Sequence, residues 1–234
     1  MVVTGSAFPI GDGGVGKTAL ARAFSFYTDC EKDIICSQNT KKTVNMEFEF
    51  VKTQCEHKEE AVMIQLYVPP GQRMEEQESE LGTFEKILDT YEFMPNMQKI
   101  AVLLLVFKIN EFSTFAVLEK WLDTVLLRGL VKDYTSIMLV GTHMDVVDRE
   151  VEEYQIIDAL NFTRERVLGN TEHWKGNISY ALVSNTTGQG ICDLKRKVAT
   201  MVCLANIIRQ NSNPLEPLHP CPGCTLYEGK IILH

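Results

Sequence analysis

A glycine-rich stretch near the amino terminus, "GDGGVGKT" at residues 11–18, constrains the fold of this chain more than any other feature. It fits the pattern G-x-x-x-x-G-K-[ST] at every required position. Gly13 and Gly14 let the backbone turn its N–H groups inward without a Cβ in the way. Residues 17–28, which have a helical pattern, add the N-terminus of a helix to this anion-binding nest. The stretch therefore predicts a phosphate-binding loop between a first strand and a helix.

Two side chains of this loop have expected roles in chemistry. Lys17 should reach the outer phosphates as a point charge, and the Thr18 hydroxyl should ligate Mg²⁺. The residues expected to bind the nucleotide here are Gly13, Gly14, Val15, Gly16, Lys17, Thr18 and Ala19. The motif alone does not separate GTPases from ATPases or nucleoside kinases.

Strand-like and helix-like segments alternate along the chain, which predicts an α/β fold with a parallel sheet covered on both faces. The expected strands are 4–10, 44–54, 61–68, 100–107, 136–142 and 178–183. The expected helices are 17–28, 83–93, 113–127, 149–168 and 190–209. The second and third strands should form an antiparallel hairpin, which gives a mostly parallel six-stranded sheet of the P-loop NTPase type. Pro9 is unusual in a central strand because it has no N–H.

Composition narrows the functional classes. With 234 residues, 45% of them hydrophobic, the chain suits one globular domain, expected over 1–210 and followed by a flexible tail over 211–234. A net charge of −8 argues against a general electrostatic grip on nucleic acid. The longest apolar run, "IAVLLLVF" at 100–107, is far shorter than the ~20 residues that span a bilayer. The seven cysteines, without a secretion signal, indicate reduced thiols and a cytoplasmic protein.

The segment "LVGTHMD" at residues 139–145 closes a buried strand and points to the base. Asp145 would accept hydrogen bonds from the N1–H and the exocyclic amine of guanine, neither of which adenine offers there. Thr142 should tie this segment to the phosphate loop, and His143 could stack on the base. Asp145 could instead be the N-cap of the next helix.

A third segment, "VSNTTGQGI" at residues 183–191, has the order and spacing of a base-contacting loop. Together the three segments resemble the Ras superfamily of small GTPases, over roughly residues 5 to 210, and most of all its Roc, Rho and Rab-like members. In the third segment Ser184 keeps its place, whereas Asn185 and Thr186 replace the alanine and lysine of the family. The resemblance implies that this loop contacts the guanine oxygen.

The resemblance also implies two switch segments, near 30–48 and 68–95. Thr43 would close over the γ-phosphate and ligate Mg²⁺ beside Thr18. Gly71 would offer its N–H to the γ-phosphate, and Gln72 would orient the attacking water. Arg73 could add positive charge to the transition state, although a solvated surface role is the ordinary one.

The sequence departs from the family at "YVPPGQR", residues 67–73. Val68 stands where the family carries an acid that helps to hold magnesium, mostly through water. The direct ligands are retained, so we expect a weakened metal site and slow hydrolysis. Pro69 and Pro70 stiffen the backbone next to Gly71.

The function implied is a switch that binds GTP and GDP with Mg²⁺, hydrolyses GTP slowly and meets effectors and regulators through its switch segments. Two alternatives stay open: a non-hydrolysing scaffold of the pseudo-GTPase kind, and a nucleoside or metabolite kinase. In the tail, Cys221, Cys224, His219 and His234 could hold zinc, but one C-x-x-C is a weak signal.

Overall fold

A computed structural model describes residues 2–26, 46–55, 58–69, 88–89, 99–212, 224–227 and 230–233. Within them, six strands form one sheet in the order β2-β3-β1-β4-β5-β6. All neighbours are parallel except the β2–β3 pair. The strands are β1 (Val3–Ile10), β2 (Glu47–Cys55), β3 (Lys58–Val68), β4 (Ile100–Lys108), β5 (Ser136–Thr142) and β6 (Ile178–Leu182). The mostly parallel six-stranded sheet predicted from the sequence is confirmed.

The central strands follow from uniformly apolar sequence. Every residue of β5 is buried, and so is every residue of β4 except Lys108. Strands buried on both faces lose the alternation of polar and apolar residues that marks a half-exposed strand. The β2–β3 hairpin keeps that alternation, with Val51 buried and its neighbours Phe50 and Lys52 exposed.

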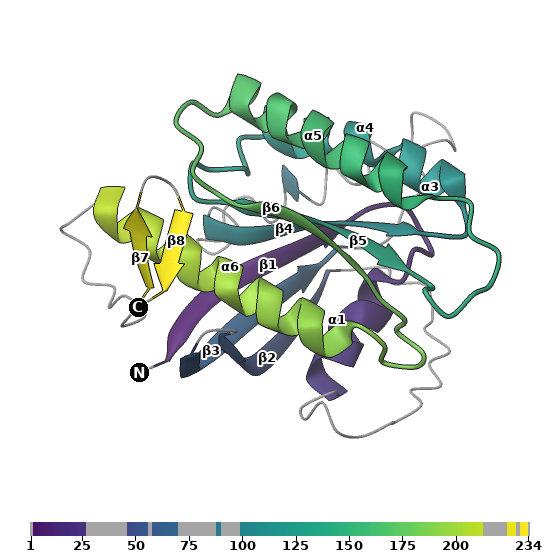
Figure 1. Cartoon of the computed structure of the whole chain (residues 1–234), viewed down its shortest axis with the longest axis horizontal. Coiled ribbons are helices and arrows are strands. Elements are labelled where there is room, and N and C mark those ends of the chain that lie inside the picture. Colours follow the sequence, from purple (N-terminus) through teal and green to yellow (C-terminus); the bar gives the residue numbers. More distant parts are fainter. Residues whose placement is uncertain are drawn as a thin grey trace.

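Helices cover both faces of the sheet, as predicted (Figure 1). On one face, α1 (Lys17–Phe26) and α6 (Ile191–Ser212) pack into a core that includes Leu20 and Val202. On the other, α3 (Phe112–Ala116), α4 (Leu118–Leu127) and α5 (Glu153–Asn170) pack into a core that includes Trp121 and Val167. The carboxyl ends of the parallel strands therefore meet at one edge, where open α/β sheets bind ligands.

Several helix boundaries differ from the sequence prediction, two of them substantially. The helix expected over 83–93 lies outside the described residues except for 88–89. The helix expected over 113–127 is divided at Val117, which ends α3 and precedes α4. The helix expected from 149 begins at Glu153, because Glu152 and Gln155 form a capping box. In a capping box each side chain accepts the other residue's backbone N–H, which fixes the first turn.

Pro9 lies inside the central strand β1, opposite Leu104 of β4. The pairing of β1 with β3 ends at Ala7, two residues earlier, whereas pairing with β4 continues to Ile10. Pro9 therefore has no paired residue on the β3 side. A proline, which has no N–H, can be accommodated there without losing a hydrogen bond to β3.

The tail contains a short antiparallel hairpin of β7 (Cys224–Tyr227) and β8 (Lys230–Leu233), beside α6 in Figure 1. The sequence pattern predicts no strands there. Of the zinc candidates, Cys221, His219 and His234 lie outside the described residues, and the domain boundary near 210 stays a prediction. Among the helices that the structure describes, none combines the length and the apolar character needed to cross a membrane.

Candidate nucleotide-binding site

The glycine-rich loop connects β1 to α1 at the carboxyl edge of the sheet (Figure 1). Gly11 has a φ of 144°, and a Cβ on it would lie 2.1 Å from the Val106 carbonyl oxygen. Gly16 has a φ of 92°, and its missing Cβ would lie 2.9 Å from the Asn185 amide nitrogen. Only glycine satisfies both the backbone angle and the close approach. Glycine at these two positions is thus favoured by the neighbouring strand β4 and by the loop that contains Asn185.

Lys17 folds back over the loop. Its Nζ donates to the carbonyl oxygen of Gly11 at 2.6 Å and to that of Asp12 at 2.8 Å. Only 5% of the residue is exposed. Burial lowers the pKa of Lys17 to about 7, and the nearby Asp12 opposes this effect. A phosphate arriving here would exchange these neutral acceptors for a charged one, which favours the ammonium form.

Asp12 is a site residue that the sequence reasoning missed. It is 6% exposed, and its Oδ1 accepts a hydrogen bond of 2.8 Å from the indole Nε1 of Trp121. Trp121 lies on α4, so this bond connects the phosphate loop to a helix far along the chain. Asp12 occupies an unrestricted position of the motif, and nothing in the loop sequence could have identified its partner.

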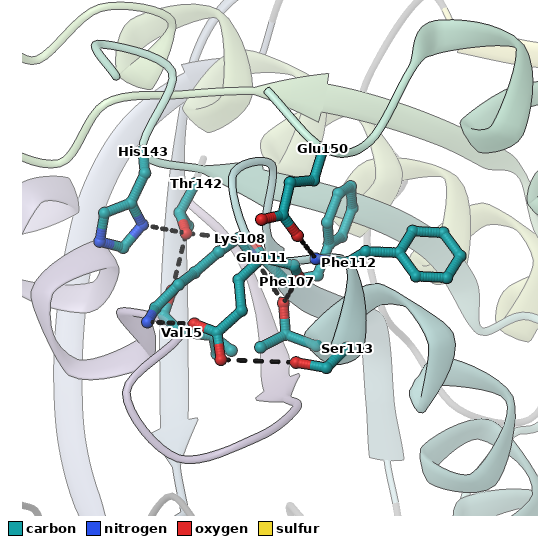
Figure 2. A network of polar contacts seen from close by, with 10 residues as sticks. Val15, Phe107, Lys108, Glu111, Phe112, Ser113, Thr142, His143 and Glu150 are labelled. Carbon is teal, nitrogen blue, oxygen red and sulfur yellow. Dashed lines mark hydrogen bonds and ion pairs between the residues drawn. The ribbon is translucent and has the colours of Figure 1, made fainter. Parts of the chain in front are cut away.

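Thr142, the last residue of β5, joins the base segment to the phosphate loop (Figure 2). Its buried Oγ1 lies 2.8 Å from the Val15 carbonyl oxygen and 3.0 Å from that of Phe107. The Nδ1 of His143 lies 2.8 Å from the same Oγ1. A hydroxyl has one proton and two carbonyl oxygens accept it here, so the third contact requires a donor. We therefore assign the Nδ1–H tautomer to His143.

His143 is half-buried and has a left-handed backbone, with φ of 62°. Burial lowers the pKa of His143, Lys108 lowers it further, and Asp145 and Glu111 oppose the shift. Lys108 is itself held by Glu111, its Nζ 2.7 Å from Oε2 (Figure 2). The lowered pKa favours the neutral imidazole, so His143 brings less positive charge than the lysine that the family has at this place.

Asp145 is exposed at the end of this segment, where a ligand can reach its carboxylate. The backbone around it is fixed, because Met144 N–H donates to the Val183 carbonyl oxygen at 3.1 Å and Val146 N–H to that of His143 at 3.0 Å. The alternative role of helix N-cap is wrong, because the next helix begins at Glu153 and has its N-cap at Glu152.

The third segment lies against the same loop. The Nδ2 of Asn185 donates to the Gly16 carbonyl oxygen at 3.2 Å. Ser184 is buried, and its Oγ accepts from the Thr187 N–H at 3.0 Å, which shapes the turn. Thr186 is exposed. Asn185, which stands where the family has alanine, thus adds a direct hydrogen bond between the loop at residues 183–191 and the phosphate loop.

The side of the site where Mg²⁺ is expected, near Thr18 and Val68, differs from the base side. Thr18 is the second residue of α1 and is partly exposed, as a ligand at the helix start should be. Val68 ends β3 with 0% exposure, in the core cluster that also contains Val15. A buried isopropyl group offers no oxygen to Mg²⁺ or to its water, so this position does not fit the metal, whereas Thr18 does.

Four residues expected at the site lie outside the described residues: Thr43, Gly71, Gln72 and Arg73. Among those described, no group of three or more His, Cys, Asp and Glu side chains could hold a metal ion. The structure therefore brings together the phosphate and base segments of the predicted site.

A glycine-rich loop at the carboxyl edge of a parallel sheet, with two further strand-end loops bonded to it, defines a P-loop nucleotide-binding protein. The model of the Ras family matches residues 8–165, which is more than half of the chain. The chain belongs to the Ras family. No curated protein matched it. Membership of this family supports a GTP-binding switch.

Proposed function

We propose that the protein is a switch that binds GTP and GDP with Mg²⁺ and hydrolyses GTP slowly. The observation that carries the proposal is the 2.8 Å contact between the Thr142 hydroxyl and the Val15 carbonyl oxygen. It places the predicted base segment directly against the predicted phosphate loop, although 127 positions separate the two residues. A guanine near one and phosphates on the other would belong to a single ligand.

Each described group has a role in this proposal. The loop amides from Gly13 to Ala19 and the start of α1 hold the phosphates, with Lys17 at the outer ones. Asp145 accepts from the N1–H and the amine of guanine. The backbone of Ser184 to Thr186 meets the guanine oxygen, and the His143 ring lies along the base.

Hydrolysis depends on groups of which the structure describes only some. Thr18 would ligate Mg²⁺ together with Thr43, and Gln72 would orient the water. The metal, when bound, neutralises the charge that develops as the phosphate leaves. Val68 supplies no acid to hold the metal's water, so we expect the metal to bind weakly and turnover to be slow.

The direct test is isothermal titration of the full chain with GTP, GDP and ATP, each with and without Mg²⁺. We expect GTP and GDP to bind and ATP to bind far more weakly, with a modest gain from Mg²⁺. Absence of GTP binding in both conditions would end the proposal. Stronger binding of ATP than of GTP would favour a nucleoside or metabolite kinase.

A second test concerns the metal alone. Val68→Asp restores an acid at the end of β3, and we expect it to raise both the Mg²⁺ dependence of GTP binding and the rate of hydrolysis. Val68→Asn is the matched control, because asparagine has nearly the shape of aspartate without its charge. Equal kinetics in the two variants would mean that position 68 does not face the metal.

The buried Val68 also favours a second candidate, a non-hydrolysing scaffold that keeps nucleotide as a structural ligand. Effectors and regulators of a switch would read segments near 30–48 and 68–95, in the cytoplasm, and would prefer one nucleotide state. A partner that binds the GTP and GDP forms equally would support the scaffold.

A further inference from the structure

A cavity of about 370 Å³ lies on the sheet face opposite α1 and α6, enclosed by α3, α4 and α5. Figure 1 shows these three helices running together over β4 and β5. The floor is made by Leu105 and Leu139, which are directly opposite each other in the two strands. The space thus reaches the sheet itself, and its volume is within the range of small-molecule sites.

Small side chains are part of the cavity lining. Ala116 of α3 and Ala159 of α5 both line it, and a larger side chain at either position would take up part of the space. Aromatic rings also frame it. Phe115 is fixed by edge-on contact with Phe107 at 5.0 Å, whereas Phe112 and Phe162 remain 42% and 40% exposed. Two large apolar rings exposed beside a hollow are typical of a binding surface.

The charged groups that line the cavity are both acidic: Glu119 on α4 and Asp158 on α5. Both are exposed, one on each wall. In the part of the chain that the structure describes, no lysine or arginine lines the cavity. The neighbouring Arg166 is engaged with Asp123 through two hydrogen bonds of 2.8 and 2.7 Å. The cavity therefore has an apolar, aromatic interior and negative walls, which favours a cation with an apolar body.

We propose that this cavity is a second binding site, for a small organic cation: a compact aryl or alkyl group that carries an ammonium. The apolar body fills the space between Ala116 and Ala159 above the Leu105–Leu139 floor, and the ammonium lies between Glu119 and Asp158. A volume of about 370 Å³ above the two strands suits a compact ligand better than an extended peptide. The cavity shares no lining residue with the nucleotide site, so this proposal does not rest on the proposed function.

The test uses three probes of equal size and different charge: 3-phenylpropylammonium, 3-phenylpropan-1-ol and 3-phenylpropionate. The full-length chain, labelled at its alanine and leucine methyl groups, is titrated with each and followed by NMR. We expect the ammonium to shift the methyl signals of Ala116, Ala159, Leu105 and Leu139. It should bind about tenfold more tightly than the alcohol, and the carboxylate more weakly still, because two partly solvated carboxylates each contribute modestly.

Two kinds of variant separate shape from charge. Ala159→Phe fills the cavity and should abolish the shifts. Glu119→Gln combined with Asp158→Asn should leave binding of the alcohol intact and reduce the preference for the cation to about twofold. Glu165→Gln removes an exposed acid of α5 outside the cavity and should change nothing. If Ala159→Phe fails to fold, the charge variants still decide.

Equal binding of the three probes, or shifts that persist in a folded Ala159→Phe variant, would overturn the proposal. A final arm titrates the acetylated, amidated tripeptide Leu-Phe-Arg. Tighter binding of this peptide than of 3-phenylpropylammonium would also overturn it, in favour of a protein-docking surface with the same chemistry.

Discussion

The base side and the metal side of the nucleotide site are built differently. On the base side, Thr142 and Asn185 reach across from the ends of β5 and β6 and hydrogen-bond to carbonyls of the phosphate loop. On the metal side, β3 ends in the buried, aliphatic Val68. In the proposed site, different strands would therefore serve base recognition and the metal. We expect nucleotide binding and nucleotide hydrolysis to be separable for this reason.

The largest effect should come from the base-reading carboxylate. Asp145→Ala leaves the N1–H and the amine of guanine without their acceptor, so the preference for GTP over ATP should fall by up to about 10⁴-fold. Competition of both nucleotides against a fluorescent GDP measures this ratio. Asp148→Ala, which removes another exposed acid three positions along, should leave it unchanged. An unaltered ratio in Asp145→Ala would break the comparison, because the base side would then not read the base.

The next effect is a pH dependence that comes from Lys17. Burial lowers the pKa of Lys17 to about 7, below its ordinary value, and a bound phosphate should raise it again. Binding then takes up a proton above pH 7. The affinity for nucleotide should be highest below pH 7, where the titration of Lys17 no longer affects it. It should fall by up to about tenfold per pH unit as the pH rises above 7, until the pKa of Lys17 in the complex is reached.

Isothermal titration with GDP between pH 7.5 and 9, in buffers of different ionisation enthalpy, counts this proton. The phosphates are already ionised in that range, since their second pKa is about 6. Lys17→Arg is the control, because a guanidinium stays charged throughout. A pH slope that is the same in both proteins would assign the proton to another group.

A smaller effect on GDP affinity should distinguish Thr142, at the end of β5, from Thr135, just before its start. Thr142→Val leaves the Val15 and Phe107 carbonyl oxygens without their donor, which costs about 1–3 kcal/mol and should lower GDP affinity about tenfold. Thr135→Val is closely matched, since Thr135 is equally buried and its Oγ1 donates to the Ile100 carbonyl oxygen at 2.8 Å. It should lose comparable stability in urea without losing affinity. Similar affinity losses in both variants would mean that Thr142 acts only through folding.

Sequence reasoning succeeded where one local rule decides the structure. The apolar runs of β4 and β5 have few alternatives to a buried strand, and the glycine pattern of residues 11–18 has a steric cause in Val106 and Asn185. The predicted start of α5, at residue 149, is four residues too early. The charged residues before Glu153 are not helical, and the Glu152–Gln155 capping pair in the sequence marks the true start.

The remaining features depend on contacts between distant segments. The Trp121–Asp12 bond spans 109 positions; Asp12 is at an unrestricted position of the glycine-rich motif, and Trp121 lies in no motif. The tautomer assigned to His143 follows from its contact with Thr142, whose other partners only the folded sheet supplies. The cavity over Leu105 and Leu139 is likewise lined by residues of separate helices and strands.

The two tryptophans provide the mildest test, because each donates one hydrogen bond at opposite ends of the sheet. Trp121 Nε1 donates to the Asp12 carboxylate at 2.8 Å beside the phosphate loop, and Trp174 Nε1 donates to the Thr135 carbonyl oxygen at 2.7 Å. Each tryptophan-to-phenylalanine variant should lose about 1–3 kcal/mol of unfolding free energy, with the larger loss at Trp121 because its acceptor is charged.

Only Trp121→Phe should weaken the binding of GDP, by a few-fold, because it loosens the glycine-rich loop that we expect to contact the phosphates. Fluorescence sharpens the contrast, because each variant leaves a single tryptophan in the chain. Adding GDP should change the emission of Trp121 in the Trp174→Phe protein and leave that of Trp174 in the Trp121→Phe protein unaltered. An equal response at both tryptophans would mean that nucleotide binding changes the whole sheet, and the base side could then not be treated as a local, preformed frame.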